Sequence, residues 1–178
     1  MNMKRVIKPE GACNIEIEDV SLPEIKETEV LIRTERTLIS RGSEIWRRYV
    51  RKEAIDPQIM GYSLAGTIVQ VGSRVDDFSM GERVAALAPH AEFVAVEVVN
   101  ARNKPSVVSL PDAVTNEAAT FWPLTTSSVL WMQETGAGPG DTMAMLGQGL
   151  VGSGCMQVAK HLNQCRVVAV DALALRCD

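Results

Sequence analysis

Apolar and polar side chains alternate along most of the first 110 residues. The alternation is clearest at residues 4–8 and 13–19, which the turn Pro9-Glu10-Gly11 separates. A period of two residues predicts strands that bury one face. Further runs of this kind, divided by turn residues, predict strands at residues 29–37, 63–71, 83–87, 91–99 and 107–110. Many short strands joined by tight turns indicate a small barrel or sandwich.

Helical patterns appear once within this region and again beyond it. Residues 43–52 predict a short helix, with Ser43 as its N-cap. Residues 115–120 and 123–135 predict two more helices, and the glycine-rich stretch 136–140 ends the second one. The chain therefore changes from mostly strand to mixed helix and strand after about residue 110.

Residues 142–171 show a compact α/β pattern. Residues 142–146 predict a short apolar strand, and residues 166–170 predict a second strand that ends at Asp171. Between them lie a glycine-rich turn and a helix whose apolar positions are Val151, Cys155, Val158, Ala159 and Leu162. The order strand, glycine turn, helix, strand, acid is that of a dinucleotide-binding unit.

The glycine turn has the chemistry that a pyrophosphate needs. Gly147 permits the tight turn, Gly149 lets the phosphates approach the backbone, and Gly152 lets the helix pack closely on the strand. The first amides of the helix add free N–H groups and a positive dipole end. Asp171 would bind the adenosine ribose hydroxyls, which favours NAD over NADP, with NADP still possible. The predicted cofactor-binding residues of the turn are Gly147, Gly149, Leu150, Val151 and Gly152; the alternative is a tight turn that binds nothing.

Composition excludes several classes of function. The chain has 178 residues, of which 46% are hydrophobic and 22% charged, and its net charge is −4. An acidic chain has no general attraction to nucleic acid or to anionic membranes, and no apolar run approaches the roughly 18 residues that span a bilayer. The N-terminus turns charged before a signal peptide could form, so we expect a cytoplasmic protein. The four cysteines form no Cys-x-x-Cys pair, which argues against a zinc knuckle.

One cluster of basic and aromatic residues stands out against the acidic background. It consists of Trp46, Arg47, Arg48, Tyr49, Arg51 and Lys52 on the first predicted helix. A solvated helix face is the favoured interpretation, and phosphate binding is the alternative.

Several motifs together resemble one known family. They are Gly61-Tyr-Ser-Leu-Ala-Gly-Thr-Ile-Val-Gln-Val-Gly72, residues 75–84, residues 91–96, residues 110–119 and Pro123-Leu-Thr-Thr126. Their sequence and order resemble the medium-chain dehydrogenase/reductase family. The resemblance implies a mixed α/β fold, with a GroES-like partly open β-barrel at residues 1–120 and the start of a Rossmann domain at residues 121–178. It also implies NAD(P)-dependent hydride transfer to or from a small alcohol, carbonyl or activated alkene.

The chain departs from the zinc-dependent members of that family at the metal-ligand positions. Arg41 stands where they have a cysteine, Tyr62 replaces the histidine of their Gly-His-Glu motif, and Trp122 replaces a further ligand. A catalytic zinc needs about three N, S or carboxylate ligands, so we predict no zinc. The pattern resembles zinc-free branches of the family. Trp122 and Thr126 would line the nicotinamide pocket, although Trp122 could equally belong to the core.

Three residues are the candidate catalytic groups. Ser43 matches the family's proton-relay hydroxyl, although an N-cap role is equally open. The Tyr62 phenol would donate a hydrogen bond to a substrate oxygen, or else pack as a core side chain. Arg41 would neutralise an oxyanion, but the favoured interpretation is a local ion pair with Glu44. We expect His90, in a turn, to face water.

The resemblance also implies a longer protein, because the family's Rossmann domain continues through further strands. We therefore expect this chain to be the amino-terminal portion of a zinc-independent oxidoreductase, acting on a small molecule. A noncatalytic GroES-like binding module, or a truncated product with a vestigial cofactor loop, is the alternative. The uncovered half of the Rossmann sheet would then associate with itself or with a partner chain.

Overall fold

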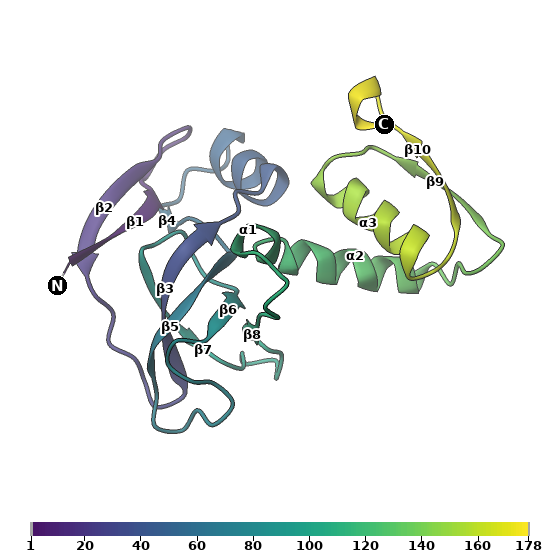
Figure 1. Ribbon diagram of the computed structural model, residues 1–178. Helices are drawn as coiled ribbons and strands as arrows, with labels where there is room; N and C mark the ends of the chain where they lie inside the picture. The colour runs from purple at the N-terminus through teal and green to yellow at the C-terminus, as the bar shows by residue number, and fades with distance from the viewer. Residues whose placement is uncertain (1, 178) are drawn as a thin grey trace. The chain divides into compact units, whose positions relative to one another are not determined.

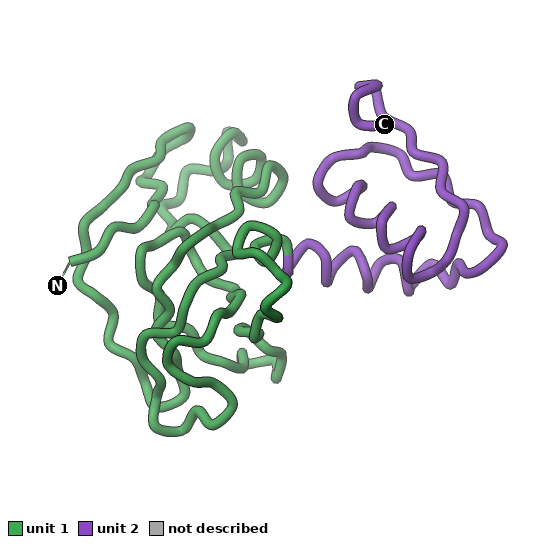
Figure 2. The backbone as a smooth tube through the Cα atoms, in the orientation of Figure 1, with its two compact units in different colours: residues 1–121 green, residues 122–178 purple. Residues whose placement is uncertain are grey.

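The computed structural model describes residues 2–177, which form two compact units (Figures 1 and 2). Unit 1 ends at Phe121 and unit 2 begins at Trp122. None of the helices in this described part is long and apolar enough to cross a membrane.

Unit 1 is built from two antiparallel sheets. The larger has the strand order β7-β3-β5-β6-β8, and the smaller has the order β2-β1-β4. Strand β1 also touches the segment before β7, because the Val6 amide donates to the His90 carbonyl over 2.8 Å and the Glu92 amide donates to the Lys4 carbonyl over 2.9 Å. The two sheets thus curve into a partly closed barrel (Figure 1). The strands are β1 (Asn2–Lys8), β2 (Glu16–Ser21), β3 (Glu29–Thr37), β4 (Gln58–Ile59), β5 (Leu64–Val71), β6 (Arg83–Ala86), β7 (Phe93–Glu97) and β8 (Val107–Ser109).

The core of unit 1 follows from the period-two pattern. Alternate residues of β3 and β5 point inward, and the side chains that are at most 1% exposed include Val30, Ile32, Leu64, Ile68 and Val84. Two short helices flank the sheets, η1 (Arg41–Val50) and α1 (Asn116–Ala119). The Thr115 side chain caps α1 by accepting a hydrogen bond from the Ala118 amide.

Helix η1 begins earlier than its sequence pattern predicts, and it has π-helical geometry. Its N-cap is Ser40, whose hydroxyl accepts a hydrogen bond from the Ser43 amide over 3.2 Å. The prediction of Ser43 as N-cap is therefore wrong: Ser43 lies inside the first turn and is exposed. The wider π-helical turn also lets Glu44 reach back to the Ser40 amide, which completes a reciprocal cap.

Unit 2 consists of α2 (Trp122–Glu134), β9 (Thr142–Leu146), α3 (Leu150–His161), β10 (Arg166–Val170) and the short η2 (Ala174–Arg176). Strands β9 and β10 are parallel and in register over five residues, from Thr142 opposite Arg166 to Leu146 opposite Val170. Helix α3 packs between these strands and α2 (Figure 1), around a core of Met132, Cys155, Val158 and Ala159.

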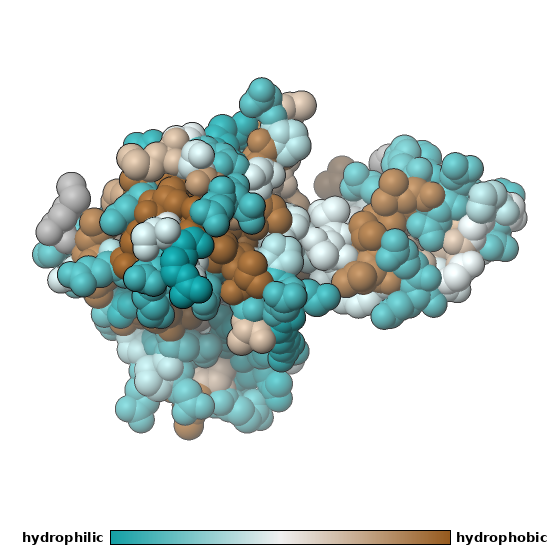
Figure 3. Space-filling model, turned by 90° about the horizontal axis from the view of Figure 1, so that it is seen from below, coloured by the Kyte–Doolittle hydropathy of each residue, from teal (hydrophilic) through white to brown (hydrophobic). Residues whose placement is uncertain are grey.

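The two-stranded sheet of unit 2 buries one face. Met143, Met145 and Val167 pack against the α3 core. On the opposite face Leu146 is 80% exposed, and Val168 and Val170 are each nearly half exposed. Hydrophobic side chains are visible at the surface of both units in Figure 3. The second face of this two-stranded sheet is therefore exposed in the described residues.

Candidate functional site

The glycine turn of unit 2 has a geometry that only glycine permits. Gly147 has a φ of +88°, in the left-handed region. A Cβ on Gly152 would lie 1.8 Å from the Gly147 carbonyl oxygen, so the first turn of α3 lies directly against the loop. The Gly147 amide donates to the Val170 carbonyl over 2.7 Å, which ties the loop to the end of β10.

Asp171 is held against this loop by backbone amides. Its Oδ1 accepts a hydrogen bond from the Leu173 amide at 2.9 Å, and its Oδ2 accepts one from the Gln148 amide at 2.7 Å. These two bonds, first that from Leu173, lower the pKa of the Asp171 carboxyl below its ordinary value. Arg176 Nη1 lies 3.6 Å from Oδ2. Gln148 and Arg176 could not be predicted as site residues from the sequence, because both meet Asp171 only through the folded turn.

The space above the loop suits a dinucleotide pyrophosphate. A Cβ added at Gly147 or Gly149 would meet no atom within 4 Å, so the backbone here is open to a ligand. Gly149 is the N-cap of α3 and has no side chain to satisfy the first amides of the helix, at Leu150 and Val151. These residues would hold the phosphates, and Asp171 lies where a ribose would follow. When bound, such a nicotinamide cofactor supplies the hydride chemistry.

Two of the candidate catalytic residues of unit 1 lie on η1, which also carries one member of a buried polar cluster. Arg41 and Ser43 lie on η1 with exposed side chains. Glu44, the next residue after Ser43, points inward instead and is 1% exposed. Glu44 Oε1 lies 2.9 Å from His90 Nε2, and Glu44 Oε2 accepts a hydrogen bond from the Ser40 amide over 2.8 Å.

Two predictions about this cluster are wrong. The partner of Glu44 is His90 and not Arg41, which forms no ion pair within the described residues. His90 is 8% exposed and does not face water. The physical reason is the same for both, because a carboxylate turned into the barrel must find a partner there, and His90 supplies it from 46 residues away.

The electrostatics of Glu44 combine opposing effects. Burial acts to raise the pKa of its carboxyl, and the hydrogen bonds from His90 and the Ser40 amide act to lower it. The nearby positive charge of Arg48 adds to the lowering, so the net pKa of Glu44 lies below its ordinary value. Glu44 is therefore an ionised group at neutral pH that anchors η1.

Tyr62 lies beside the same cluster. It follows Gly61, whose φ is +103° and whose Cβ would lie 2.3 Å from the His90 amide nitrogen. The Tyr62 hydroxyl is buried and has no hydrogen-bond partner among the described residues. Its neighbour Ser63 is satisfied, since it donates to the Thr120 carbonyl over 2.6 Å. The Tyr62 phenol thus has an unused donor, as a group that binds a substrate oxygen requires.

The remaining candidates lie on α2 in unit 2. Thr126 is exposed, and its hydroxyl donates to the Trp122 carbonyl over 2.9 Å. Trp122 is the first residue of the helix and is half-buried. Unit 1 therefore carries Arg41, Ser43 and Tyr62, and unit 2 carries Thr126 and the glycine loop.

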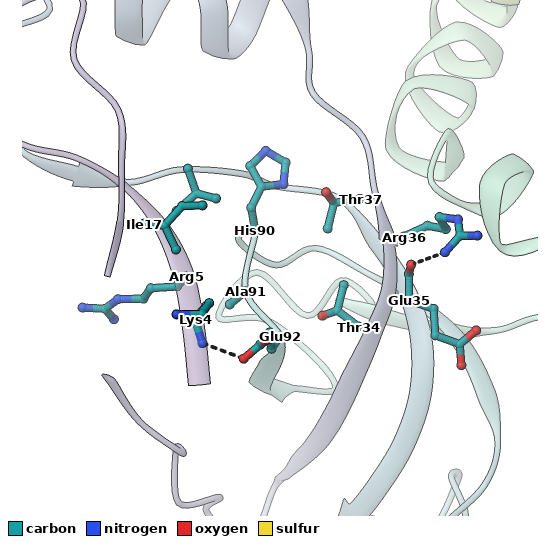
Figure 4. A pocket seen from close by; sticks show the side chains of 11 residues that line it. Lys4, Arg5, Ile17, Thr34, Glu35, Arg36, Thr37, His90, Ala91 and Glu92 are labelled. Carbon is teal, nitrogen blue, oxygen red and sulfur yellow. Dashed lines mark hydrogen bonds between the residues drawn. The ribbon is translucent and has the colours of Figure 1, made fainter. Parts of the chain in front are cut away.

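A pocket of about 320 Å³ opens between β1, β3 and the segment 90–92, and His90 of the polar cluster is one of its lining residues (Figure 4). Its charged side chains are largely paired, as in Lys4 with Asp19 and Arg36 with Glu117. Two buried polar atoms at its wall, Thr34 Oγ1 and His90 Nδ1, lack partners among the described residues. The pocket contains none of the predicted site residues.

Within residues 2–177, no group of three or more His, Cys, Asp or Glu side chains lies close enough to hold a metal ion. Arg41, Tyr62 and Trp122 occupy the positions at which the resemblance implies zinc ligands, and the absence of zinc stays a prediction.

Comparison with known proteins identifies the larger part of unit 1. The model for the alcohol dehydrogenase GroES-like domain matches residues 26–110. Residues 26–110 belong to the alcohol dehydrogenase GroES-like domain family. Over this segment and beyond it, the chain is similar to dehydrogenases.

Two characterised relatives illustrate the similarity. The chain is 30% identical over 122 residues to D-guloside 3-dehydrogenase of Escherichia coli, which covers 67% of this chain and 33% of that protein. It is 27% identical to sorbitol dehydrogenase of Bacillus subtilis, with 99% of this chain and 58% of that protein aligned. The chain thus spans between a third and three fifths of the length of these relatives.

Solved structures show the same fold for the GroES-like domain and the βαβ segment after it. An Escherichia coli oxidoreductase/dehydrogenase of unknown specificity superposes with a TM-score of 0.84 at 21% identity, over 99% of this chain and 59% of that one. Galactitol-1-phosphate dehydrogenase of Escherichia coli gives a TM-score of 0.80 at 21% identity, over 98% of this chain and 57% of that one. The predicted mixed α/β fold class is thereby confirmed.

Proposed function

We propose that this chain is the amino-terminal portion of a zinc-independent, NAD-dependent oxidoreductase. It transfers a hydride to or from a small alcohol, carbonyl or activated alkene. The observation that carries the proposal is the glycine loop of unit 2, which is open above Gly147 and Gly149 and is bordered by the ionised Asp171. The similarity of the chain to D-guloside 3-dehydrogenase and sorbitol dehydrogenase supports the proposal.

In this proposal the residues of unit 1 handle the substrate oxygen. Tyr62 donates a hydrogen bond to that oxygen, Ser43 passes the proton to solvent, and Arg41 stabilises developing negative charge. The buried hydroxyl of Tyr62 and the unpaired guanidinium of Arg41 support these roles, since each has donors that no other described residue uses.

The first test is binding of NADH, measured by calorimetric titration of the wild type and of Gly149→Asp. Gly149 has a φ of −74° and open space around its Cβ position, so the variant folds normally. The new carboxylate repels the pyrophosphate, and we expect NADH affinity to fall roughly 100-fold or more, equivalent to about 2.7 kcal/mol.

Gly138→Asp is the matched control, because Gly138 also has open space around its Cβ and lies outside the loop. It should bind NADH as the wild type does. If wild type binds no NADH, or if Gly149→Asp binds it unchanged, the loop is not a cofactor site.

NADH oxidation with a panel of small carbonyls, after dialysis of the protein against a chelator, then tests hydride transfer. Activity that is lost when the chelator removes the metal contradicts zinc independence.

A noncatalytic binding module is the second candidate function. The exposed apolar face of β9 and β10 favours it, since Leu146, Val168 and Val170 are available to a partner. Absence of NADH binding, together with concentration-dependent self-association or capture of a partner chain through this face, would support this second candidate.

A further inference from the structure

Helix η1 and the residues just after it concentrate positive charge at the surface of unit 1. We call the side chains of Arg41, Arg47, Arg48, Arg51 and Lys52 the η1 cationic surface. Residues 41–53 contain these five cations and two carboxylates, which gives a local charge of +3. Because the whole chain has a net charge of −4, the remainder carries −7.

Most of these cations have no ion-pair partner among residues 2–177. Arg51 Nε lies 3.4 Å from a Glu53 carboxylate oxygen, and this is the one ion pair formed by the η1 cationic surface in the described part of the chain. The other carboxylate of the segment, Glu44, is turned inward and bound to His90. The guanidinium groups of the helix therefore keep their donors for an external anion.

Apolar side chains lie beside these cations. Trp46 is 60% exposed, and Ile45 and Val50 on the same helix are 39% and 44% exposed. A tryptophan ring this open to water offers a flat apolar face to the C–H groups of a carbohydrate or polyol. The surface thus combines an anion-binding part with a part that suits a small carbon skeleton.

The η1 cationic surface is continuous with a candidate catalytic residue. Ser43 and Arg47 are four positions apart on η1, close to one turn of a π-helix, so they neighbour each other on the helix surface. An anionic group held by Arg47 would therefore place the rest of a small molecule within reach of the Ser43 hydroxyl.

We propose that the η1 cationic surface binds the phosphate group of a phosphorylated polyol or sugar, and that this molecule is the substrate of the oxidoreductase. The inference rests on the proposed function and names its substrate class. A phosphate monoester carries up to two negative charges, which two or more arginines match with bidentate hydrogen bonds. Trp46 contacts the carbon chain, and the phosphate-free end approaches Ser43.

A single phosphate fits the charge distribution better than an extended polyanion does. The positive segment is short, and the rest of the protein carries −7. Exposed charges are largely screened beyond a Debye length of about 8 Å at physiological salt, so the parts of a nucleic acid or an anionic membrane that extend past the positive segment gain no attraction from it. A small phosphorylated molecule contacts the positive segment alone.

The test is calorimetric binding of sorbitol 6-phosphate and of sorbitol to the purified protein, with inorganic phosphate as a competitor. We expect sorbitol 6-phosphate to bind at least tenfold more tightly than sorbitol, and phosphate to compete. Arg47→Ala should reduce affinity for the phosphorylated probe about tenfold without changing affinity for sorbitol. Arg74→Ala is the matched control, an exposed arginine outside the surface, and should change neither.

Three outcomes would overturn the inference: equal affinities for the two probes, an unchanged affinity in Arg47→Ala, or an equal loss in Arg74→Ala. Preferential binding to anionic phospholipid vesicles or to nucleic acid, lost in Arg47→Ala, would assign the surface to a different ligand.

NADH binding is measured on the same preparation. If NADH binds but phosphate gives no preference, only this inference fails; if the preference is present without NADH binding, the proposed function fails.

Discussion

At the scale of single residues, Glu44 shows how one buried carboxylate organises the candidate site. It links the N-terminus of η1, through the Ser40 amide, to His90, which packs against Gly61 just before Tyr62. Arg41 and Ser43 on the helix are thereby connected to the Tyr62 segment. Removing one member of a buried hydrogen-bonded pair leaves the other without its partner, which costs more than the pair contributes.

This arrangement predicts a pH-dependent stability. Folding lowers the pKa of Glu44 from its ordinary value of 4.5. Its stabilising contribution is therefore fully present above pH 4.5 and is lost as the pH falls through the lower pKa of the folded protein. Glu44→Gln should lower the free energy of unfolding at pH 7 by about 1–3 kcal/mol, and should make stability less sensitive to acid.

Urea unfolding at pH 7 and at successively lower pH values measures both effects. Glu53→Gln is the matched control, since the Glu53 side chain is 74% exposed, and it should change stability by less than about 0.5 kcal/mol. An acid sensitivity that is the same in wild type and Glu44→Gln would show that Glu44 does not carry it.

At the scale of elements, the start of η1 offers a direct comparison of two serines. The Ser40 hydroxyl caps the helix, and the Ser43 hydroxyl does not. Ser40→Ala should therefore lower the free energy of unfolding by about 0.5–2 kcal/mol, whereas Ser43→Ala should leave it nearly unchanged. Equilibrium denaturation of both variants checks this, and a larger loss in Ser43→Ala would contradict the assigned cap.

Elements with strong local signals could be predicted from the sequence alone. The strands at residues 142–146 and 166–170 have their predicted bounds, because an apolar run ends at a glycine turn or an acid in each case. The start of η1 could not be predicted, since its cap depends on how the π-helical turn lets Glu44 reach Ser40. The burial of His90 depends on a partner 46 residues away, a contact that no local pattern contains.

Side chains with unusual environments were missed for the same reason. Lys8 is fully buried, and its ammonium donates to the carbonyls of Pro9, Gly11 and Asp56. In the sequence it is one polar position of an alternating strand. Its burial follows from the loop around Gly11, whose amide donates to the Ile55 carbonyl over 2.8 Å.

At the scale of the whole molecule, the two units differ in how completely they bury their sheets. The five-stranded sheet of unit 1 surrounds a large set of fully buried aliphatic side chains. Unit 2 has a core cluster of four buried residues and a two-stranded sheet whose second face is exposed. Local opening free energy follows such burial, so the units should open separately and with different free energies.

Hydrogen exchange measured by mass spectrometry tests this difference. Amides of β9 and β10 should exchange at least roughly tenfold faster than those of β3 and β5, because fewer apolar contacts oppose their opening. NADH should slow exchange in residues 142–171, since it binds only the folded loop. At an NADH concentration 100 times the Kd, the free energy of opening should rise by up to about 2.7 kcal/mol. Protection that is equal in both units would contradict separate opening. Protection by NADH confined to unit 1 would instead place the cofactor away from the glycine loop and remove the basis for Asp171 as its ribose ligand.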